Sequence, residues 1–144
     1  MDTVFEIRRY INSLEASKQS DMQLLHEFIV SCLPGTKLWF NTGINESNKV
    51  VSNPSIGYGS YQHSFANGQC KELFQIGLSA NTKGISIHLM GIRQSLDIAK
   101  TFGHQIGKAK VSSYCIQFKH IKDIHLEVLK HAILLAVKTS SQLE

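Results

Sequence analysis

The sequence predicts an α+β fold in which helices pack on one face of an antiparallel sheet. First, three β-patterned segments follow one another at residues 56–63, 73–79 and 85–90, and the loops between them contain Gly and Asn, as hairpin loops do. Second, segments with helical apolar spacing precede and follow this region. Third, the strands alternate between apolar and polar residues, so helices are expected to cover the apolar face alone.

Two helices are expected before the sheet, over residues 4–14 and 20–33. The second is expected to begin at a capping box formed by Ser20 and Gln23 and to end before Pro34. The apolar stripe of the first helix consists of Val4, Ile7, Ile11 and Leu14.

Later in the chain, a short helix is expected over residues 95–102 and a final helix over residues 124–137. Besides the three segments of the meander, strands are expected over residues 37–40 and 114–118. The polar connection before the meander is weakly patterned, and it is predicted to contain at most one short strand, around Val50.

Strand alternation assigns side chains to the two faces of the sheet. In the segment 73–79, Phe74 is expected on the apolar face and Gln75 on the polar face. Gly77 lies among the polar-face residues, where the missing side chain would permit the close approach of a ligand. The polar face is expected to be either a binding surface or an ordinary hydrated sheet surface. Its expected members are Gln75, Ser79, Ser86, His88, Gln117 and Lys119.

The positive charge of the chain is concentrated in its last third. The net charge is +4, and residues 100–144 account for all of it, with seven Lys against three acidic residues. Such a region either is an ordinary solvated surface or attracts an anionic small molecule or protein. Nucleic acid is not the expected partner, because only three of the fifteen basic residues are Arg, the side chain suited to planar, bidentate contacts. The centre of this region consists of Lys108, Lys110, Lys119 and Lys122.

Length and composition predict a single domain over residues 1–144, located in the cytoplasm. The hydrophobic fraction of 42% and the charged fraction of 18% are near the averages of globular proteins. The longest apolar run, residues 132–137, is too short to cross a membrane, and the acidic start of the chain does not resemble an export signal. The three Cys are widely spaced without a CxxC motif, so neither a disulfide framework nor a zinc site is expected.

No enzymatic activity is expected, because the sequence contains none of the common catalytic motifs. It lacks a GxSxG elbow, a Walker loop and a GxGxxG fingerprint, and no cofactor is predicted. The seven His form neither an HxxxH nor an HExxH motif, so no metal site is predicted. Trp39, together with either Tyr58 or Tyr61, is expected to line an apolar pocket or, alternatively, these rings pack in the core.

Three parts of the chain form a recognisable pattern. They are Ile-Gly-Tyr-Gly-Ser-Tyr at residues 56–61, Lys83 in a turn between strands, and Gly-Lys-Ala-Lys at residues 107–110 followed by Cys115. This pattern resembles the YdhG-like family of small bacterial domains of unknown function. Where the family has a second Gly-Lys pair, residues 112–113 of this chain are Ser-Ser. The resemblance implies the same α+β fold, and some members of the family have been likened to frataxin-type iron chaperones.

The function expected from the sequence is a non-enzymatic module that binds a small molecule or a protein, and the alternative is an intracellular iron chaperone resembling frataxin. The acidic ridge of frataxin-like proteins is missing, because the first helix carries Asp2, Glu6 and Glu15 beside Arg8 and Arg9. The candidate ligand-binding residues are Trp39, Tyr58, Tyr61, Gln75, Lys83, His88, Lys108, Lys110, Gln117 and Lys119.

Overall fold

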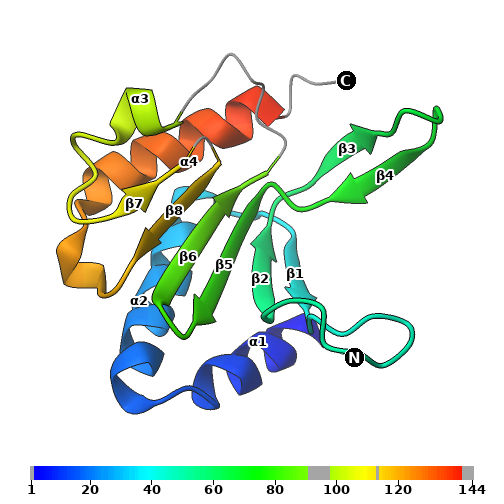
Figure 1. Ribbon diagram of the computed structural model, residues 1–144, viewed down its shortest axis with the longest axis horizontal. Helices are drawn as coiled ribbons and strands as arrows, with labels where there is room; N and C mark the ends of the chain where they lie inside the picture. The colour runs from blue at the N-terminus through cyan, green and yellow to red at the C-terminus, as the bar shows by residue number, and fades with distance from the viewer. Residues whose placement is uncertain (1, 91–97, 113, 141–144) are drawn as a thin grey trace.

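The computed structural model consists of an antiparallel sheet with helices on one face, which confirms the α+β class predicted from the sequence (Figure 1). The structure describes residues 2–90, 98–112 and 114–140. The elements of these residues are, in chain order, α1 (Thr3–Asn12), α2 (Ala16–Cys32), β1 (Leu38–Asn41), β2 (Ser55–Tyr58), β3 (Tyr61–Ser64), β4 (Cys70–Leu73), β5 (Ile76–Asn81), β6 (Gly84–Leu89), α3 (Ile98–Phe102), β7 (Lys110–Val111), β8 (Cys115–Phe118), a short 3-10 helix (Ile121–Asp123) and α4 (Leu126–Ser140).

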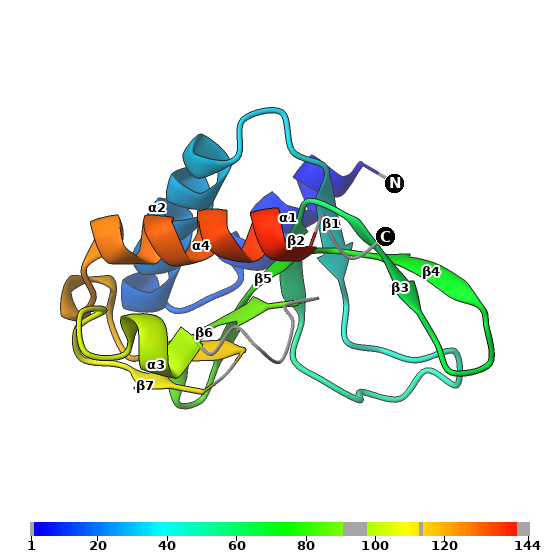
Figure 2. The same ribbon diagram turned by 90° about the horizontal axis from the view of Figure 1, so that it is seen from above.

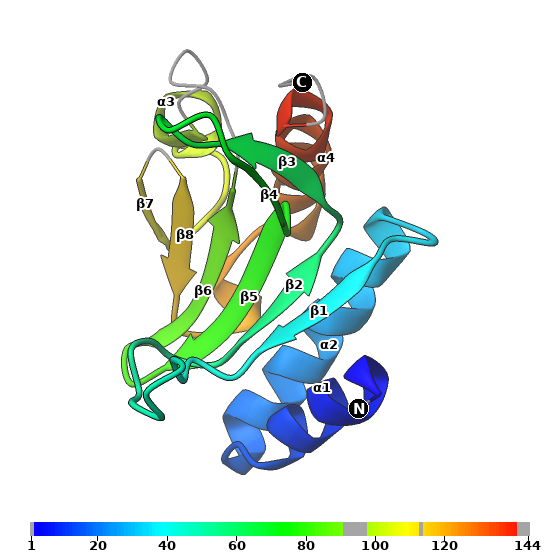
Figure 3. The same cartoon turned by 90° about the vertical axis from the view of Figure 1, so that its right-hand side faces the viewer.

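The central sheet has the strand order β1-β2-β5-β6-β8-β7, and neighbouring strands are antiparallel. Figure 3 shows α1, α2 and α4 behind this sheet. Among the described residues, no helix covers the opposite face, which we call the open face. No described helix combines the length and the apolar character that a membrane crossing requires.

The hydrophobic core fills the space between the sheet and the helices. Alternate residues of the strands point into this space, and several of them have no exposed surface. Burying an aliphatic side chain of this size stabilises the fold by about 1.5 to 3 kcal/mol, so this layer holds the helices against the sheet. The fully buried core residues of the strands are Ile56, Tyr58, Ile76, Leu78, Ile85, Ile87, Leu89 and Ile116, and those of α2 and α4 are Met22, Leu25, Ile29, Leu129 and Ile133.

The two N-terminal helices form close to where the sequence predicts them. The carboxylate of Asp2 accepts a hydrogen bond from the backbone N–H of Val4 at 3.0 Å and caps α1. Val4 itself is half-exposed and does not belong to the buried stripe, contrary to the prediction. α2 begins at Ala16, one turn before the predicted capping box at Ser20, because the intervening residues include neither Gly nor Pro and can extend the helix.

Two of the predicted meander strands are each divided in the structure. The segment 56–63 contains β2 and β3, and the segment 73–79 contains the end of β4 and most of β5. Gly59 separates β2 from β3 with a φ of +77°, a left-handed conformation that glycine adopts readily. β3 and β4 therefore leave the central sheet and pair with each other as a hairpin that extends away from the body (Figure 2).

Smaller differences concern the ends of the chain and its connections. The connection before β2 has an isolated bridge between Ile44 and Val50 in place of the predicted short strand. The two-residue strand β7 was not expected from the sequence, and it forms because it pairs with β8. The predicted helix over residues 95–102 corresponds to α3, while residues 95–97 lie outside the described residues. α4 begins and ends slightly later than predicted.

Lowering the pH from about 7.5 to about 5 is expected to reduce the free energy of unfolding. Burial lowers the pKa of both His26 and His88 below the ordinary value of 6.5. In this pH range the unfolded chain therefore binds more protons than the folded protein, and stability decreases as the pH falls through 6.5. Denaturant unfolding at both pH values measures the decrease, which should be smaller in His88→Gln. An equal decrease in the variant would show that His88 does not contribute.

Candidate functional site

Four lysines surround a concavity at the end of the sheet formed by β7 and β8. We call this concavity of about 400 Å³ the basic pocket. It unites five of the ten residues that the sequence singles out as candidate ligand-binding residues. The lining residues are Lys83, Lys108, Ala109, Lys110, Gln117, Phe118, Lys119 and Asp123.

The turn between β5 and β6 brings Lys83 to this pocket. The backbone N–H of Lys83 donates a hydrogen bond to Oδ1 of Asn81 at 2.9 Å, which stabilises the turn. The next residue, Gly84, has a φ of +137°, and a Cβ atom built there would lie 2.3 Å from the carbonyl oxygen of Phe118. Because Gly84 has no side chain, the turn can lie against the end of β8, next to Lys119.

β7 and the segment before it position the other two lysines. Lys110 is paired with Gln117 across β7 and β8, so the two side chains project from the same face of the sheet. Before β7, the backbone N–H of Lys108 donates to the carbonyl oxygen of Asp123 at 2.7 Å. Gly107 pairs with Ile124 in an isolated bridge at this point, which fixes Lys108 beside the chain that leaves β8.

The positive charges of the basic pocket are not neutralised by neighbouring acids. Within the described part of the chain, none of its four lysines forms an ion pair, whereas Lys37 pairs with Glu72 at 3.0 Å elsewhere on the surface. The four ammonium groups are on exposed residues, and Asp123 is the one acidic residue among those lining the pocket. A concave surface with this excess of one charge attracts anions and raises their local concentration.

A second concavity, of about 370 Å³, lies on the open face between β2, β5 and β6. We call it the polar depression. Its wall includes hydroxyl and amide groups, of which the Ser79 hydroxyl donates to the carbonyl oxygen of Pro54 at 2.8 Å and the Asn81 amide donates to Ser86 Oγ at 3.0 Å. The lining residues are Ser52, Asn53, Ser55, Phe74, Gly77, Ser79, Asn81, Ser86, His88 and Met90.

His88, another of the candidate residues, lies in this depression. Its imidazole is half-buried, and burial lowers its pKa, so that the ring is neutral at pH 7. Among the described residues, its side chain has no hydrogen-bond partner. A neutral imidazole offers one donor and one acceptor, and both are available to a ligand here.

Phe74 and Gln75 have exchanged the faces that strand alternation predicts for them. A Cβ atom built on Gly57 or Gly77 would lie 2.6 Å or 2.9 Å from the Phe74 ring, so this ring covers the paired glycines on the open face. Gln75 is 5% exposed and points to the helix side, where its amide donates to Ser140 Oγ of α4 at 2.8 Å. The prediction was wrong because alternation is interrupted where the chain passes from the hairpin into β5.

The three aromatic candidates lie apart from the basic pocket. Tyr58 has no exposed surface, and its hydroxyl lies 2.8 Å from Nδ1 of His26 in α2, so it is a core residue and not a surface for a ligand. Tyr61 belongs to the hairpin and is also buried. Trp39 lies at the open face, where its indole N–H donates to the carbonyl oxygen of Gly59 at 2.7 Å and its ring meets the edge of Phe74.

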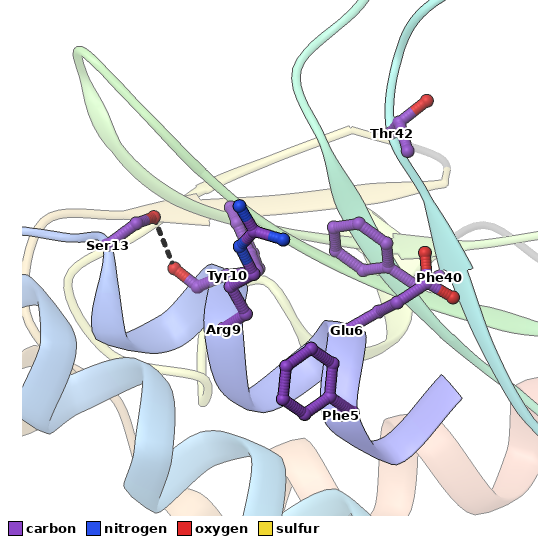
Figure 4. Close-up of a pocket in the computed structure, with 7 residues that line it drawn as sticks. All are labelled: Phe5, Glu6, Arg9, Tyr10, Ser13, Phe40 and Thr42. Carbon is purple, nitrogen blue, oxygen red and sulfur yellow. Dashed lines mark hydrogen bonds between the residues drawn. The ribbon is translucent and has the colours of Figure 1, made fainter. Parts of the chain in front are cut away.

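A third concavity, of about 300 Å³, lies between α1 and β1 (Figure 4). It contains no residue of the predicted site, and the signal that could have indicated it is Phe5, an apolar side chain off the buried stripe of α1. Glu6 and Arg9 place opposite charges among its lining residues, and the Tyr10 hydroxyl accepts a hydrogen bond from the N–H of Ala80. This cavity therefore has no net preference for a charged ligand.

Metal ligands are not gathered into a site in the parts of the chain that the structure describes. No group of three or more His, Cys, Asp or Glu side chains is placed to hold a metal ion there. Cys32, Cys70 and Cys115 are free thiols, and burial raises the pKa of Cys32 and Cys115, which disfavours their reactive thiolate forms.

Comparison of the chain with protein-family models, with curated proteins and with solved structures finds no match. The resemblance to the YdhG-like family therefore stays a prediction based on the motifs in the sequence. The assignment of a function must rest on the geometry of the pockets themselves.

Proposed function

We propose that this protein is a non-enzymatic binding module for a small, multiply charged anion, which it binds in the basic pocket. The observation that supports this proposal is the convergence of four lysines without ion-pair partners among the described residues on one concavity with a single acidic residue. Three net positive charges remain at the pocket if every side chain is ionised, which suits a phosphate group better than a single carboxylate.

The shape of the site favours a small molecule over a large partner. A concavity of about 400 Å³ falls within the usual size range of ligand pockets. The pocket is lined by Lys and contains no Arg, which fits recognition of phosphate as a point charge rather than planar, bidentate contacts with nucleic acid. The alternative of an iron chaperone lacks a supporting cluster of metal ligands in the described part of the chain.

The double substitution Lys108→Gln with Lys110→Gln is expected to weaken the binding of inorganic pyrophosphate at least about tenfold, because two ammonium groups of the pocket are lost. Stability should change by no more than about 0.5 kcal/mol, because both side chains are exposed and unpaired. Titration calorimetry at low ionic strength measures the affinity, and denaturant unfolding measures the stability.

The matched control is the double substitution Lys49→Gln with Lys71→Gln, which removes the same charge from exposed positions outside the pocket. This control should retain most of the affinity of the wild-type protein. An equal loss in both double variants would mean that the net charge of the whole protein attracts pyrophosphate. Undetectable binding to the wild-type protein would contradict the proposed function.

A further inference from the structure

We propose that the ligand is a phosphate monoester of a hydroxyl-rich compound, such as a polyol or sugar phosphate. Its phosphate group binds in the basic pocket, and its neutral hydroxylated part lies in the polar depression. This inference rests on the proposed function and adds the chemistry of the part of the ligand that carries no charge.

The two concavities adjoin each other on the open face. Gln117 lines the basic pocket and is paired in the sheet with Ser86, which lines the polar depression. Lys83 and Asn81 connect them a second time, because Lys83 lines the first concavity and its backbone N–H is bonded to Asn81 of the second. Directly paired residues of neighbouring strands have their Cβ atoms about 5 Å apart, so a ligand of a few carbon atoms reaches both concavities.

The polar depression provides hydrogen-bonding groups without charge. None of its lining residues is Asp, Glu, Lys or Arg, in contrast to the basic pocket. A second charged group on the ligand would find no counter-charge there, whereas hydroxyl groups would meet serine hydroxyls, asparagine amides and the imidazole of His88. The division of charge between the two concavities thus matches a phosphate ester with a neutral, polar remainder.

His88 and Gln117 carry the hydrogen-bonding capacity that the protein leaves unused. Within the described residues, neither side chain has a hydrogen-bond partner, although both are only partly exposed. The neutral imidazole and the amide each provide a donor and an acceptor, as an alcohol group also does. Their positions on neighbouring strands β6 and β8, close to the boundary between the concavities, suit the hydroxyls next to a phosphate ester.

Phe74 supplies the apolar part of the depression. Its ring lies against Gly57 and Gly77, whose missing side chains leave room for it, so the ring lines the depression beside His88. An aromatic ring next to hydroxyl and amide groups suits the carbon skeleton of a polyol, which has C–H groups on some faces and hydroxyls on others. The depression therefore accommodates both kinds of surface of such a ligand.

The experiment compares glycerol 1-phosphate with n-propyl phosphate, because the two have the same charge and carbon chain and differ by two hydroxyl groups. In calorimetric titrations the wild-type protein should bind glycerol 1-phosphate about tenfold more tightly, as two modest hydrogen bonds predict. In the double variant His88→Ala with Gln117→Ala this difference should disappear, while the affinity for n-propyl phosphate stays within about twofold. Thermal melting shows whether the double variant is folded.

A measurement on the wild-type protein tests the same proposal without any variant. The NMR signals of the His88 ring and the Gln117 amide should shift on addition of glycerol 1-phosphate and much less with n-propyl phosphate. Equal affinities for the two esters would overturn the inference and leave the proposed anion binding intact. If neither ester nor inorganic pyrophosphate binds, the proposed function itself fails. Adenosine monophosphate binding more than about tenfold tighter than ribose 5-phosphate would also overturn it, because the depression would then accept a base.

Discussion

The substitution Ile87→Ala is expected to lower the free energy of unfolding by about 2 to 5 kcal/mol, the usual cost of truncating a buried aliphatic side chain. Ile87 has no exposed surface and lies in β6, a central strand, where it is paired with Leu78 of β5 and Ile116 of β8. These neighbours belong to regular strands on both sides, so the surrounding side chains cannot easily fill the space that the substitution leaves.

His88→Ala is the matched control, because it truncates the next residue of the same strand on the open face. His88 is half-exposed, and its loss should cost less than about 1 kcal/mol. Denaturant unfolding of the two variants and of the wild-type protein provides the comparison. Equal destabilisation would mean that both faces of the sheet are buried, for example by a second copy of the chain. A larger loss from His88→Ala would mean that the two faces are assigned in the wrong sense.

The faces of β6 and β8 could be predicted from the sequence because these strands alternate without interruption. Ile87 and Ile116 face the core, and His88 and Gln117 face the other side, as the alternation indicates. The same rule failed at Phe74 and Gln75, because the apolar and polar residues continue to alternate while the chain turns out of the hairpin and into β5. The sequence pattern does not show where a strand changes sheets.

The basic pocket could be predicted in part. Lys108, Lys110 and Lys119 stood out because positive charge is concentrated near the end of the sequence. Their convergence with Lys83 depends on close packing between distant segments, such as the approach of the turn at Gly84 to the end of β8. Charge counting along the chain does not provide this information, and the resemblance to the YdhG-like family singled out Lys83 only by its motif.

The polar depression shows a similar division between what was predicted and what was missed. Ser79, Ser86 and His88 were expected on the open face from alternation, and they line the depression. Its other wall comes from Ser52 and Asn53, in a connection whose sequence has little periodicity. The position of such a connection is decided by long-range contacts, among them the hydrogen bond from Ser79 to the residue just before β2.

The substitution Gly57→Ala is expected to lower the free energy of unfolding by about 1 to 3 kcal/mol, because it adds a methyl group to a site without space. A Cβ atom on Gly57 would lie 2.6 Å from two ring atoms and 2.8 Å from the Cβ atom of Phe74. Phe74 cannot avoid this contact by rotation alone, since part of it involves its own Cβ atom, and the paired Gly77 side of the ring is also close.

A double-mutant cycle with Phe74→Ala decides whether this contact is the cause. In the Phe74→Ala background, Gly57→Ala should cost much less than in the wild-type protein, because the ring that it would meet is absent. Denaturant unfolding of the wild-type protein, the two single variants and the double variant gives the coupling energy. Strictly additive costs would contradict the position of Phe74 over the glycines. In that case the ring would lie on the core face, as strand alternation predicts, and the aromatic wall of the polar depression would have to be assigned to another residue.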